Sequence, residues 1–180
     1  DRIHGNHAGL PISPKFVREL HAIMMEYTDE LGGNWKSRDN AIIERYTDGS
    51  RRIRFRPTPA AETADAMRQL VDRYNDAIHH DAREPLVVVP LAILDYLCIP
   101  PIDDVNGRTS RLLTLRLLYQ QGYEVGRYIS LERIFEQTKI RYYDTLERCS
   151  QGWHEGKHDV FPWVNYFWGV MLAAYKEYEQ

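Results

Sequence analysis

Apolar side chains recur at helical spacing along most of this chain, and this periodicity limits the possible folds more than any other feature. Ser13-Pro14 is typical of a helix start, because serine caps the first turn and proline fits the first helical position. The apolar residues that follow lie three or four positions apart: Phe16, Leu20, Ile23, Met24, Tyr27 and Leu31. Further helices are expected from Thr58-Pro59 to about 78, and near 86–98, 107–121, 130–149 and 162–178. The pattern therefore predicts an all-α, mainly helical bundle.

One segment, about 40–56, departs from the helical pattern and predicts a small β-hairpin. Strand-like residues at 41–47 and 51–55 flank Asp48-Gly49, a dipeptide that favours tight hairpin turns. In the second strand Arg52, Arg54 and Arg56 alternate with Ile53 and Phe55, so one strand face is basic and the other apolar. Two interpretations stay open: a solvated basic face with the apolar side on the core, or an exposed edge that docks an acidic partner segment.

Length and composition indicate one domain spanning residues 1–180. A net charge of −3 argues against nucleic acid as a partner. No run approaches the ~20 apolar residues of a membrane span, and no signal peptide opens the chain, so the expected location is cytoplasmic. The chain begins without methionine, which we take as a sign of a fragment. Cys98 and Cys149 lack metal-ligand spacing and are expected to be buried, reduced thiols.

The segment from Asp104 to Arg111 predicts a phosphate-binding turn at the start of an apolar helix. A helix start offers free backbone N–H groups and the positive end of the helix dipole. Asn106 and Gly107 suit a turn that points successive amides at one phosphate, while Arg108 and Arg111 lie on the first helical turn. Asp104 is placed to hold a hard cation such as magnesium. We therefore expect a nucleotide pocket here.

This segment resembles the signature of the Fic family, H-P-F-x-D/E-G-N-G-R-x-x-R, and the motif loop and helix would span 100–121. The resemblance extends through most of the chain, and the segments 122–133 and 150–158 closely resemble one subfamily. The resemblance implies transfer of AMP from ATP to a protein hydroxyl, with magnesium on Asp104. It also implies that the hairpin is a flap on which a target protein docks. A homodimer is a further expectation.

Two departures from the signature bear on the chemistry. Pro100 stands where the resemblance puts the catalytic histidine, and proline cannot act as a general base, a role that often contributes ~10²–10⁴-fold in rate. Val105 stands at the first turn glycine, and a β-branched residue resists positive φ, so we expect a reshaped turn. These departures predict a degenerate protein adenylyltransferase, a pseudoenzyme that keeps its nucleotide pocket. The alternative is an active nucleotidyltransferase with another base, for which the candidates are His21, His79 and Asp103.

A remote alternative is a zinc hydrolase, because His154, Glu155 and His158 match the H-E-x-x-H pattern. Gly152, Gly156 and Pro162 argue instead for a linker between two helices.

We expect His79-His80 to complement a helix end and Tyr142-Tyr143 to pack in the core or a groove, where the resemblance puts a nucleobase pocket. Trp153, Trp163 and Trp168 are expected in the core. The segment 3–6 weakly resembles the end of an inhibitory helix that some family members carry, and we interpret the match as coincidence.

Overall fold

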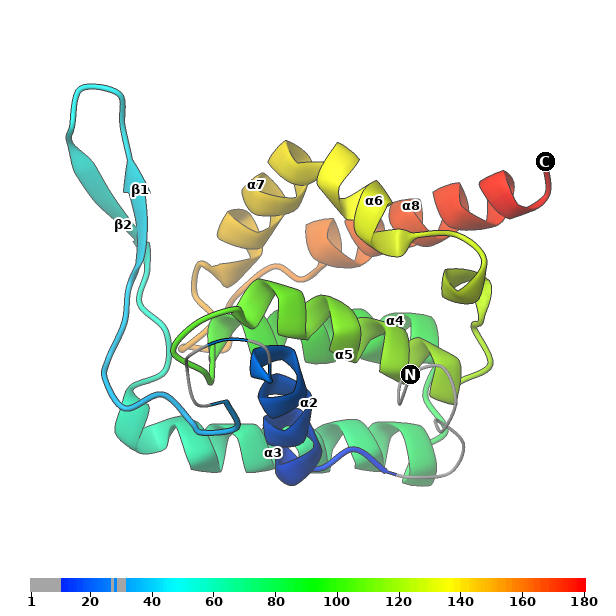
Figure 1. Cartoon of the computed structure of the whole chain (residues 1–180), viewed down its shortest axis with the longest axis horizontal. Coiled ribbons are helices and arrows are strands. Elements are labelled where there is room, and N and C mark those ends of the chain that lie inside the picture. The colour runs from blue at the N-terminus through cyan, green and yellow to red at the C-terminus, as the bar shows by residue number, and fades with distance from the viewer. Residues whose placement is uncertain (1–10, 27, 29–31) are drawn as a thin grey trace.

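The computed structural model describes residues 11–26, 28 and 32–180, so the segment 3–6 lies outside the described residues. Seven α-helices and one hairpin make up the described part of the chain (Figure 1), which confirms the predicted all-α class. The helices are α2 (Pro14–Met25), α3 (Thr63–Asn75), α4 (Pro85–Cys98), α5 (Asn106–Gln120), α6 (Leu131–Gln137), α7 (Lys139–Ser150) and α8 (Phe161–Tyr178). The strands are β1 (Ile42–Arg45) and β2 (Arg51–Phe55). Short turns of 3-10 helix lie at Ala60–Glu62 and Val125–Arg127, and a π-helical turn at Asp76–His80 follows α3.

The pair α4 and α5 forms the centre of the molecule. In Figure 1, α2 and α3 lie on one side of this pair, and α6, α7 and α8 lie on the other. Val89, Leu117 and Trp163 are among the side chains that are almost fully removed from solvent. Cys98 and Cys149 are buried and free, as predicted. This core fixes the start of α5 beside α7, where the candidate site lies.

The helix α4 continues through Pro90, and two tryptophans of α8 contact its backbone there. Proline has no N–H group, so Pro90 cannot donate the usual bond to the Leu86 carbonyl. The indole Nε1 of Trp168 donates to that carbonyl instead, at 2.8 Å, and Trp163 Nε1 donates to the Pro90 carbonyl at 2.7 Å. Trp163 is buried and Trp153 is partly buried, but Trp168 is 41% exposed, so its expected core position is wrong. The Trp168 indole contacts the first turn of α4, because its N–H group donates to the carbonyl that Pro90 leaves without a partner.

The predicted helix boundaries need three corrections. The single helix expected at 130–149 is two helices that break at Thr138, whose hydroxyl donates to the Ile134 carbonyl and bonds the Tyr166 hydroxyl at 2.8 Å. The first helix ends at Met25, before the predicted end. The run from Thr58 begins with a 3-10 turn and ends with a π-helical turn that holds the exposed His79 and His80. Apolar spacing alone does not predict where a helix ends, because local hydrogen bonds such as those of the Thr138 hydroxyl can interrupt it.

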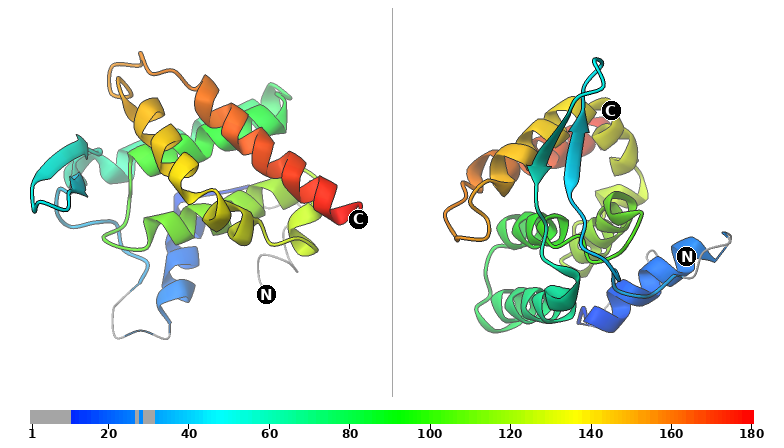
Figure 2. Two further views of the ribbon diagram at one scale, coloured as in Figure 1. Left: turned by 90° about the horizontal axis from the view of Figure 1, so that it is seen from above. Right: turned by 90° about the vertical axis from the view of Figure 1, so that its left-hand side faces the viewer.

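The hairpin has the predicted position and turn, and Figures 1 and 2 show it projecting from one end of the helical body. Its strands are antiparallel, with Ile43 opposite Ile53 and Glu44 opposite Arg52. The carboxylate of Asp48 accepts from the Ser50 amide at 2.8 Å, and Gly49 has φ +83°, a conformation that few other residues adopt readily. Because the hairpin leaves the body, its outer end is free of the core.

A buried lysine fixes the base of the hairpin to the loop that follows α4. Lys36 is 4% exposed, and its ammonium donates to the carbonyls of Thr58 and Ile99 and to the Asn40 side chain. Burial lowers the pKa of Lys36, while Asp39 and Asp103 oppose that change. Its backbone amide also donates to the Pro101 carbonyl at 2.8 Å. Lys36 thus ties both ends of the hairpin to the turn that carries Pro100.

None of the helices within 11–26, 28 and 32–180 combines the length and the apolar character that crossing a bilayer requires.

Candidate functional site

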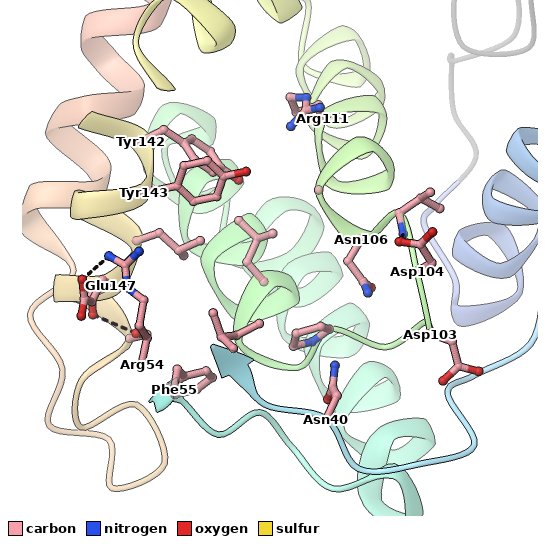
Figure 3. A pocket seen from close by; sticks show the side chains of 17 residues that line it. Asn40, Arg54, Phe55, Asp103, Asp104, Asn106, Arg111, Tyr142, Tyr143 and Glu147 are labelled. Carbon is pink, nitrogen blue, oxygen red and sulfur yellow. Dashed lines mark hydrogen bonds and ion pairs between the residues drawn. The ribbon is translucent and has the colours of Figure 1, made fainter. Parts of the chain in front are cut away.

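A cavity of about 380 Å³ opens where the start of α5, the helix α7 and the base of the hairpin meet (Figure 3). Its size lies within the range of small-molecule sites, ~300–1,000 Å³. Most of the wall is apolar or aromatic: Ile42, Phe55, Leu97, Pro100, Val105, Tyr142, Tyr143 and Leu146. The polar and charged side chains are Asn40, Arg54, Asp103, Asp104, Asn106, Arg111, Glu147 and Ser150. The predicted turn therefore lies in a cavity that suits an amphipathic ligand.

The turn before α5 has the left-handed backbone conformation that a glycine would favour. Val105 has φ +54° and ψ +18° and is the N-cap residue of α5. A left-handed conformation costs an L-residue about 1–2 kcal/mol. Among the described residues no side chain caps this helix end, and the Val105 amide donates to the Asp104 carboxylate at 2.6 Å. Val105 thus adopts positive φ at an energetic cost, and the first amides of α5 stay available to a ligand.

Asn106 stabilises the turn through its own side chain. Its Nδ2 donates to the Ile102 carbonyl at 2.6 Å, and its Oδ1 accepts from the Ile102 amide at 3.2 Å. This reciprocal pair closes the loop 102–106 just before the helix. Asn106 also lines the cavity, beside Gly107. Its side chain therefore holds the turn in shape, while the backbone of the turn faces the cavity.

The two predicted arginines differ in position. Arg111 lines the cavity and also a smaller one of about 130 Å³ between α6 and α7, and its Nε donates to the Glu132 carboxylate at 2.5 Å. Arg108 is exposed and is not among the residues that line either cavity. Arg111 is thus the arginine that the structure brings to the cavity, and Glu132 holds it there.

The aromatic wall of the cavity comes from α7. Tyr142 is buried, and burial raises the pKa of its hydroxyl despite the nearby Arg111. Tyr143 packs edge-on against Tyr142, with ring centroids 5.2 Å apart, and is 47% exposed. The two rings therefore differ: Tyr142 belongs to the core as predicted, and Tyr143 presents an accessible face to the cavity.

The acidic residues of the loop lie exposed at the cavity rim. Asp103 and Asp104 both line it, on the side opposite α7 in Figure 3. Within the part of the chain that the structure describes, no group of three or more His, Cys, Asp or Glu could hold a metal ion. A single carboxylate together with substrate phosphates is a usual way to bind magnesium. Asp104 suits that arrangement, with the remaining ligands supplied by a nucleotide and water.

The hairpin turns its basic face toward α7. Arg52 Nη2 donates to the Glu147 carboxylate at 2.6 Å, and Arg54, which lines the cavity, pairs with the second oxygen of the same carboxylate. The hydrogen bond from Arg54 lowers the pKa of Glu147. Ile43 and Ile53, a cross-strand pair, are each 46% exposed. The predicted apolar face is therefore divided: Phe55 packs against the core as expected, whereas Ile43 and Ile53 stay outside and Glu147 binds Arg52 and Arg54.

Comparison with known proteins identifies the family. The model of the Fic/DOC family matches residues 11–118, more than half of the chain. This chain belongs to the Fic/DOC family. It is 25% identical over 157 residues to the protein adenylyltransferase Fic of Drosophila ananassae and 26% identical to that of Drosophila erecta. Each match covers 87% of this chain but only 27% of the relative, so the chain spans about a quarter of these proteins.

Two solved structures share the fold of this Fic domain. One is a Fic domain containing signaling protein from Bacteroides thetaiotaomicron, with a TM-score of 0.70 and 24% identity, matched over 91% of this chain and 60% of that one. The other is a Fic family protein from Desulfovibrio desulfuricans, with a TM-score of 0.70 and 21% identity, over 92% of this chain and 46% of that one. At these identities the likeness concerns the fold alone.

Pro100 is buried and forms part of the cavity wall in this Fic domain. Of the three alternative bases considered, only Asp103 lines the cavity. His21 is buried in α2, where its Nδ1 accepts from the Gly33 amide at 2.9 Å. His79 lies on the π-helical turn after α3. Among the described residues that line the cavity, the carboxylates are Asp103, Asp104 and Glu147, and the other ionisable side chains are Arg54, Arg111, Tyr142 and Tyr143.

The H-E-x-x-H segment supports the hairpin. Residues 151–156 form turns, with Gly152 and Gly156 at positive φ, so His154 and His158 do not share a helix face. The ring of His154 bonds the Arg56 carbonyl through Nε2 at 2.7 Å and stacks on Phe55. A zinc site needs both histidines on one helix face. The geometry therefore offers no support for zinc hydrolysis and gives His154 a packing role.

Sequence reasoning missed Glu132, Glu147 and Lys36. The only signal for Glu147 was its position four residues after Tyr143, on the same helix face, which is common in any helix. Glu132 and Lys36 carry no local pattern that sets them apart. Their roles depend on distant partners: Arg111 lies 21 positions from Glu132, and Thr58 and Ile99 lie 22 and 63 positions from Lys36.

Proposed function

We propose that this Fic domain binds a nucleoside triphosphate with magnesium at the start of α5 and lacks the histidine-dependent transfer of AMP. The observation that carries the proposal is the buried Pro100 in the wall of a cavity that otherwise has phosphate-binding features. The similarity to protein adenylyltransferases supports a nucleotide as ligand and a protein as target. The missing base supports a degenerate rather than an active domain.

The wall of the cavity suits the two ends of a nucleotide. The amides of Asn106 and Gly107 lie at the positive end of the α5 dipole, where a phosphate is stabilised. Arg111 can form a charge-assisted bond to a terminal phosphate once it leaves Glu132. Asp104 would hold magnesium, which would neutralise part of the phosphate charge. The exposed face of Tyr143 offers a surface on which a base stacks. Arg108, exposed on the same helical turn, would add only long-range attraction.

Calorimetric titration with Mg-ATP tests the binding part of the proposal. Saturable binding is expected for the unchanged chain, with a loss of tenfold or more in Arg111→Ala. Arg68→Ala is a matched control, because Arg68 is an exposed arginine of α3 paired with Asp65. No heat at millimolar nucleotide would overturn the proposal, and so would an equal loss in the control variant.

Assays for AMP transfer to added protein or to the chain itself test the chemical part. The unchanged chain is expected to be inactive, and the double variant Pro100→His/Val105→Gly is expected to gain activity. Transfer by the unchanged chain that disappears in Asp103→Asn would favour the alternative, an active nucleotidyltransferase that uses Asp103 as base. Activity in the unchanged chain that survives Asp103→Asn would refute both assignments.

We further propose that a target protein docks as an extended segment along the hairpin. A two-stranded sheet has unpaired backbone groups on its outer edges, which an added strand can satisfy. The exposed Ile43 and Ile53 favour apolar side chains on that segment, since the arginines of the other face bind Glu147. Ile53→Asp is expected to abolish binding of such a target while leaving Mg-ATP affinity unchanged.

A further inference from the structure

One face of the hairpin carries two arginines directly opposite each other near its turn. Arg45 of β1 pairs with Arg51 of β2, and Ile43 pairs with Ile53 two positions further along each strand. Directly opposite residues share a sheet face, and so do residues two apart on one strand. All four side chains are exposed, and Figure 1 shows this end of the hairpin clear of the helices. We call these four residues the Arg–Ile face.

The two arginines of the Arg–Ile face have no counter-charge within the part of the chain that the structure describes. Arg52 and Arg54 both pair with Glu147, whereas neither Arg45 nor Arg51 is in an ion pair with a described residue. Like charges directly opposite on neighbouring strands repel and destabilise the pair. The whole chain has a net charge of −3, so this cationic pair is not part of a general basic excess. A carboxylate supplied from outside the hairpin would relieve the repulsion.

The outer edge of β1 is free along its whole length. In an antiparallel pair the backbone groups of every second residue bond the partner strand, and those of the residues between point outward. The Tyr46 amide donates to the Ser50 carbonyl at 3.0 Å, so Ile43 and Arg45 are the residues of β1 whose backbone groups point outward. Among the described residues, no hydrogen bond from outside the hairpin reaches the backbone of Ile42–Arg45.

The edge of β2, in contrast, is partly occupied by the segment that follows α7. Gln151 Nε2 donates to the Arg54 carbonyl at 3.2 Å, and the His154 ring bonds the Arg56 carbonyl at 2.7 Å. The helix α7 also packs against β2. A strand that added along β2 would have to displace these bonds, whereas a strand that added along β1 would displace none.

We propose that the partner of the hairpin is an extended protein segment that adds to the edge of β1 and carries an acidic residue two positions from an apolar one. This inference rests on the docking of a target along the hairpin proposed above, and it specifies the strand that is used and the chemistry of the segment. The added backbone pairs with Ile43 and Arg45. The side chain opposite Ile43 then lies beside the isoleucine pair, and the side chain opposite Arg45 lies beside the cationic pair.

The strand spacing allows one carboxylate to meet both arginines. Arg45 is on the strand next to the added segment, and Arg51 is one strand further away, a step of about 5 Å that a long arginine side chain can span. Glutamate suits this position better than aspartate, because its side chain is longer. A nucleic acid would meet the two guanidinium groups but would leave the isoleucines and the backbone edge without partners, so a protein segment is the better fit.

Titration of the unchanged chain with two end-blocked peptides, TVTETVT and TVTKTVT, followed by NMR of the backbone amides, tests the proposal. Valine flanks the central residue on both sides, so the pattern fits either strand direction. The acidic peptide is expected to bind saturably below about 5 mM and about fivefold more tightly than the lysine peptide, with the largest shifts at the Ile43 and Arg45 amides. Equal affinities, or shifts centred on the Arg51 and Ile53 amides, would refute this inference and leave docking on the hairpin standing. Binding of neither peptide would refute both.

A charge reversal separates the role of these two arginines from general electrostatic attraction. The double variant Arg45→Glu/Arg51→Glu is expected to reverse the preference, so that the lysine peptide binds about fivefold more tightly. Arg68→Glu/Arg148→Glu is the matched control: it changes the net charge equally, at arginines of α3 and α7 that are 61% and 71% exposed, and should keep the preference for the acidic peptide. An unchanged preference in the first variant, or a reversal in the control, would overturn the proposal. Tighter binding of an oligouridine of the same length than of the acidic peptide would overturn it in favour of nucleic acid.

Discussion

The indole of Trp168 compensates for the amide that Pro90 lacks, and this compensation predicts a measurable coupling energy between the two residues. In the unchanged chain the Leu86 carbonyl accepts from Trp168 Nε1 at 2.8 Å. Trp168→Phe keeps an aromatic ring but removes this donor. A hydrogen bond of this kind contributes about 0.5–1.5 kcal/mol, and because the ring is 41% exposed, water can replace part of it. We therefore expect a loss of about 1 kcal/mol in the free energy of unfolding.

The second substitution, Pro90→Ala, restores the missing backbone donor. Its amide would bond the Leu86 carbonyl within α4, so Trp168→Phe in that background would remove a bond that is no longer needed. The expected interaction energy between the two sites is about 0.5–1 kcal/mol, whereas the effects of independent sites add to within ~0.3–0.5 kcal/mol.

Urea denaturation of the four chains, followed by circular dichroism at one low protein concentration, measures this energy. Additive effects of the two substitutions would refute the compensation. A larger cost of Trp168→Phe in the Pro90→Ala background would refute it as well.

Three further perturbations follow from the ion pairs and the buried lysine. Glu132→Gln removes the exposed ion pair of Arg111, which is worth about 0.2–1 kcal/mol. Calorimetry should therefore show an Mg-ATP affinity up to about fivefold higher. An unchanged affinity would mean that Glu132 does not compete with phosphate for Arg111. Glu147→Gln should speed hydrogen exchange of the hairpin amides. Because Arg54 lowers the pKa of Glu147, the hairpin amides of the unchanged chain should exchange faster only as pH falls below the ordinary carboxyl value of 4.5. Equal exchange rates in the unchanged chain and in Glu147→Gln at neutral pH would contradict the anchoring role of Glu147. Lys36→Met leaves two buried carbonyls, those of Thr58 and Ile99, without this donor and should lower the free energy of unfolding by about 2–4 kcal/mol in urea titration. A loss below about 1 kcal/mol would show that water replaces the ammonium.

Much of the candidate site could be predicted from short stretches of sequence. A helix start close to Asn106 and a turn before it follow from the order of residues in one segment, which also puts Arg108 and Arg111 on the first helical turns. The exposed position of Arg108 could not be predicted, because it depends on how α5 faces α7. The expected reshaping by Val105 did not occur in the backbone, where the residue takes positive φ itself. The surrounding loop, closed by Asn106 on Ile102, holds that conformation against its local cost.

The sequence by itself determined the helices, the hairpin and the family, because caps, turns and apolar spacing act over only a few residues. Only the tertiary structure decided which hairpin face turns inward and which side chain holds Arg111. Arg54 and Glu147 lie 93 positions apart in the chain, and Arg111 and Glu132 lie 21 apart. Such pairs form when helix packing brings charges within reach, and no local pattern records that approach.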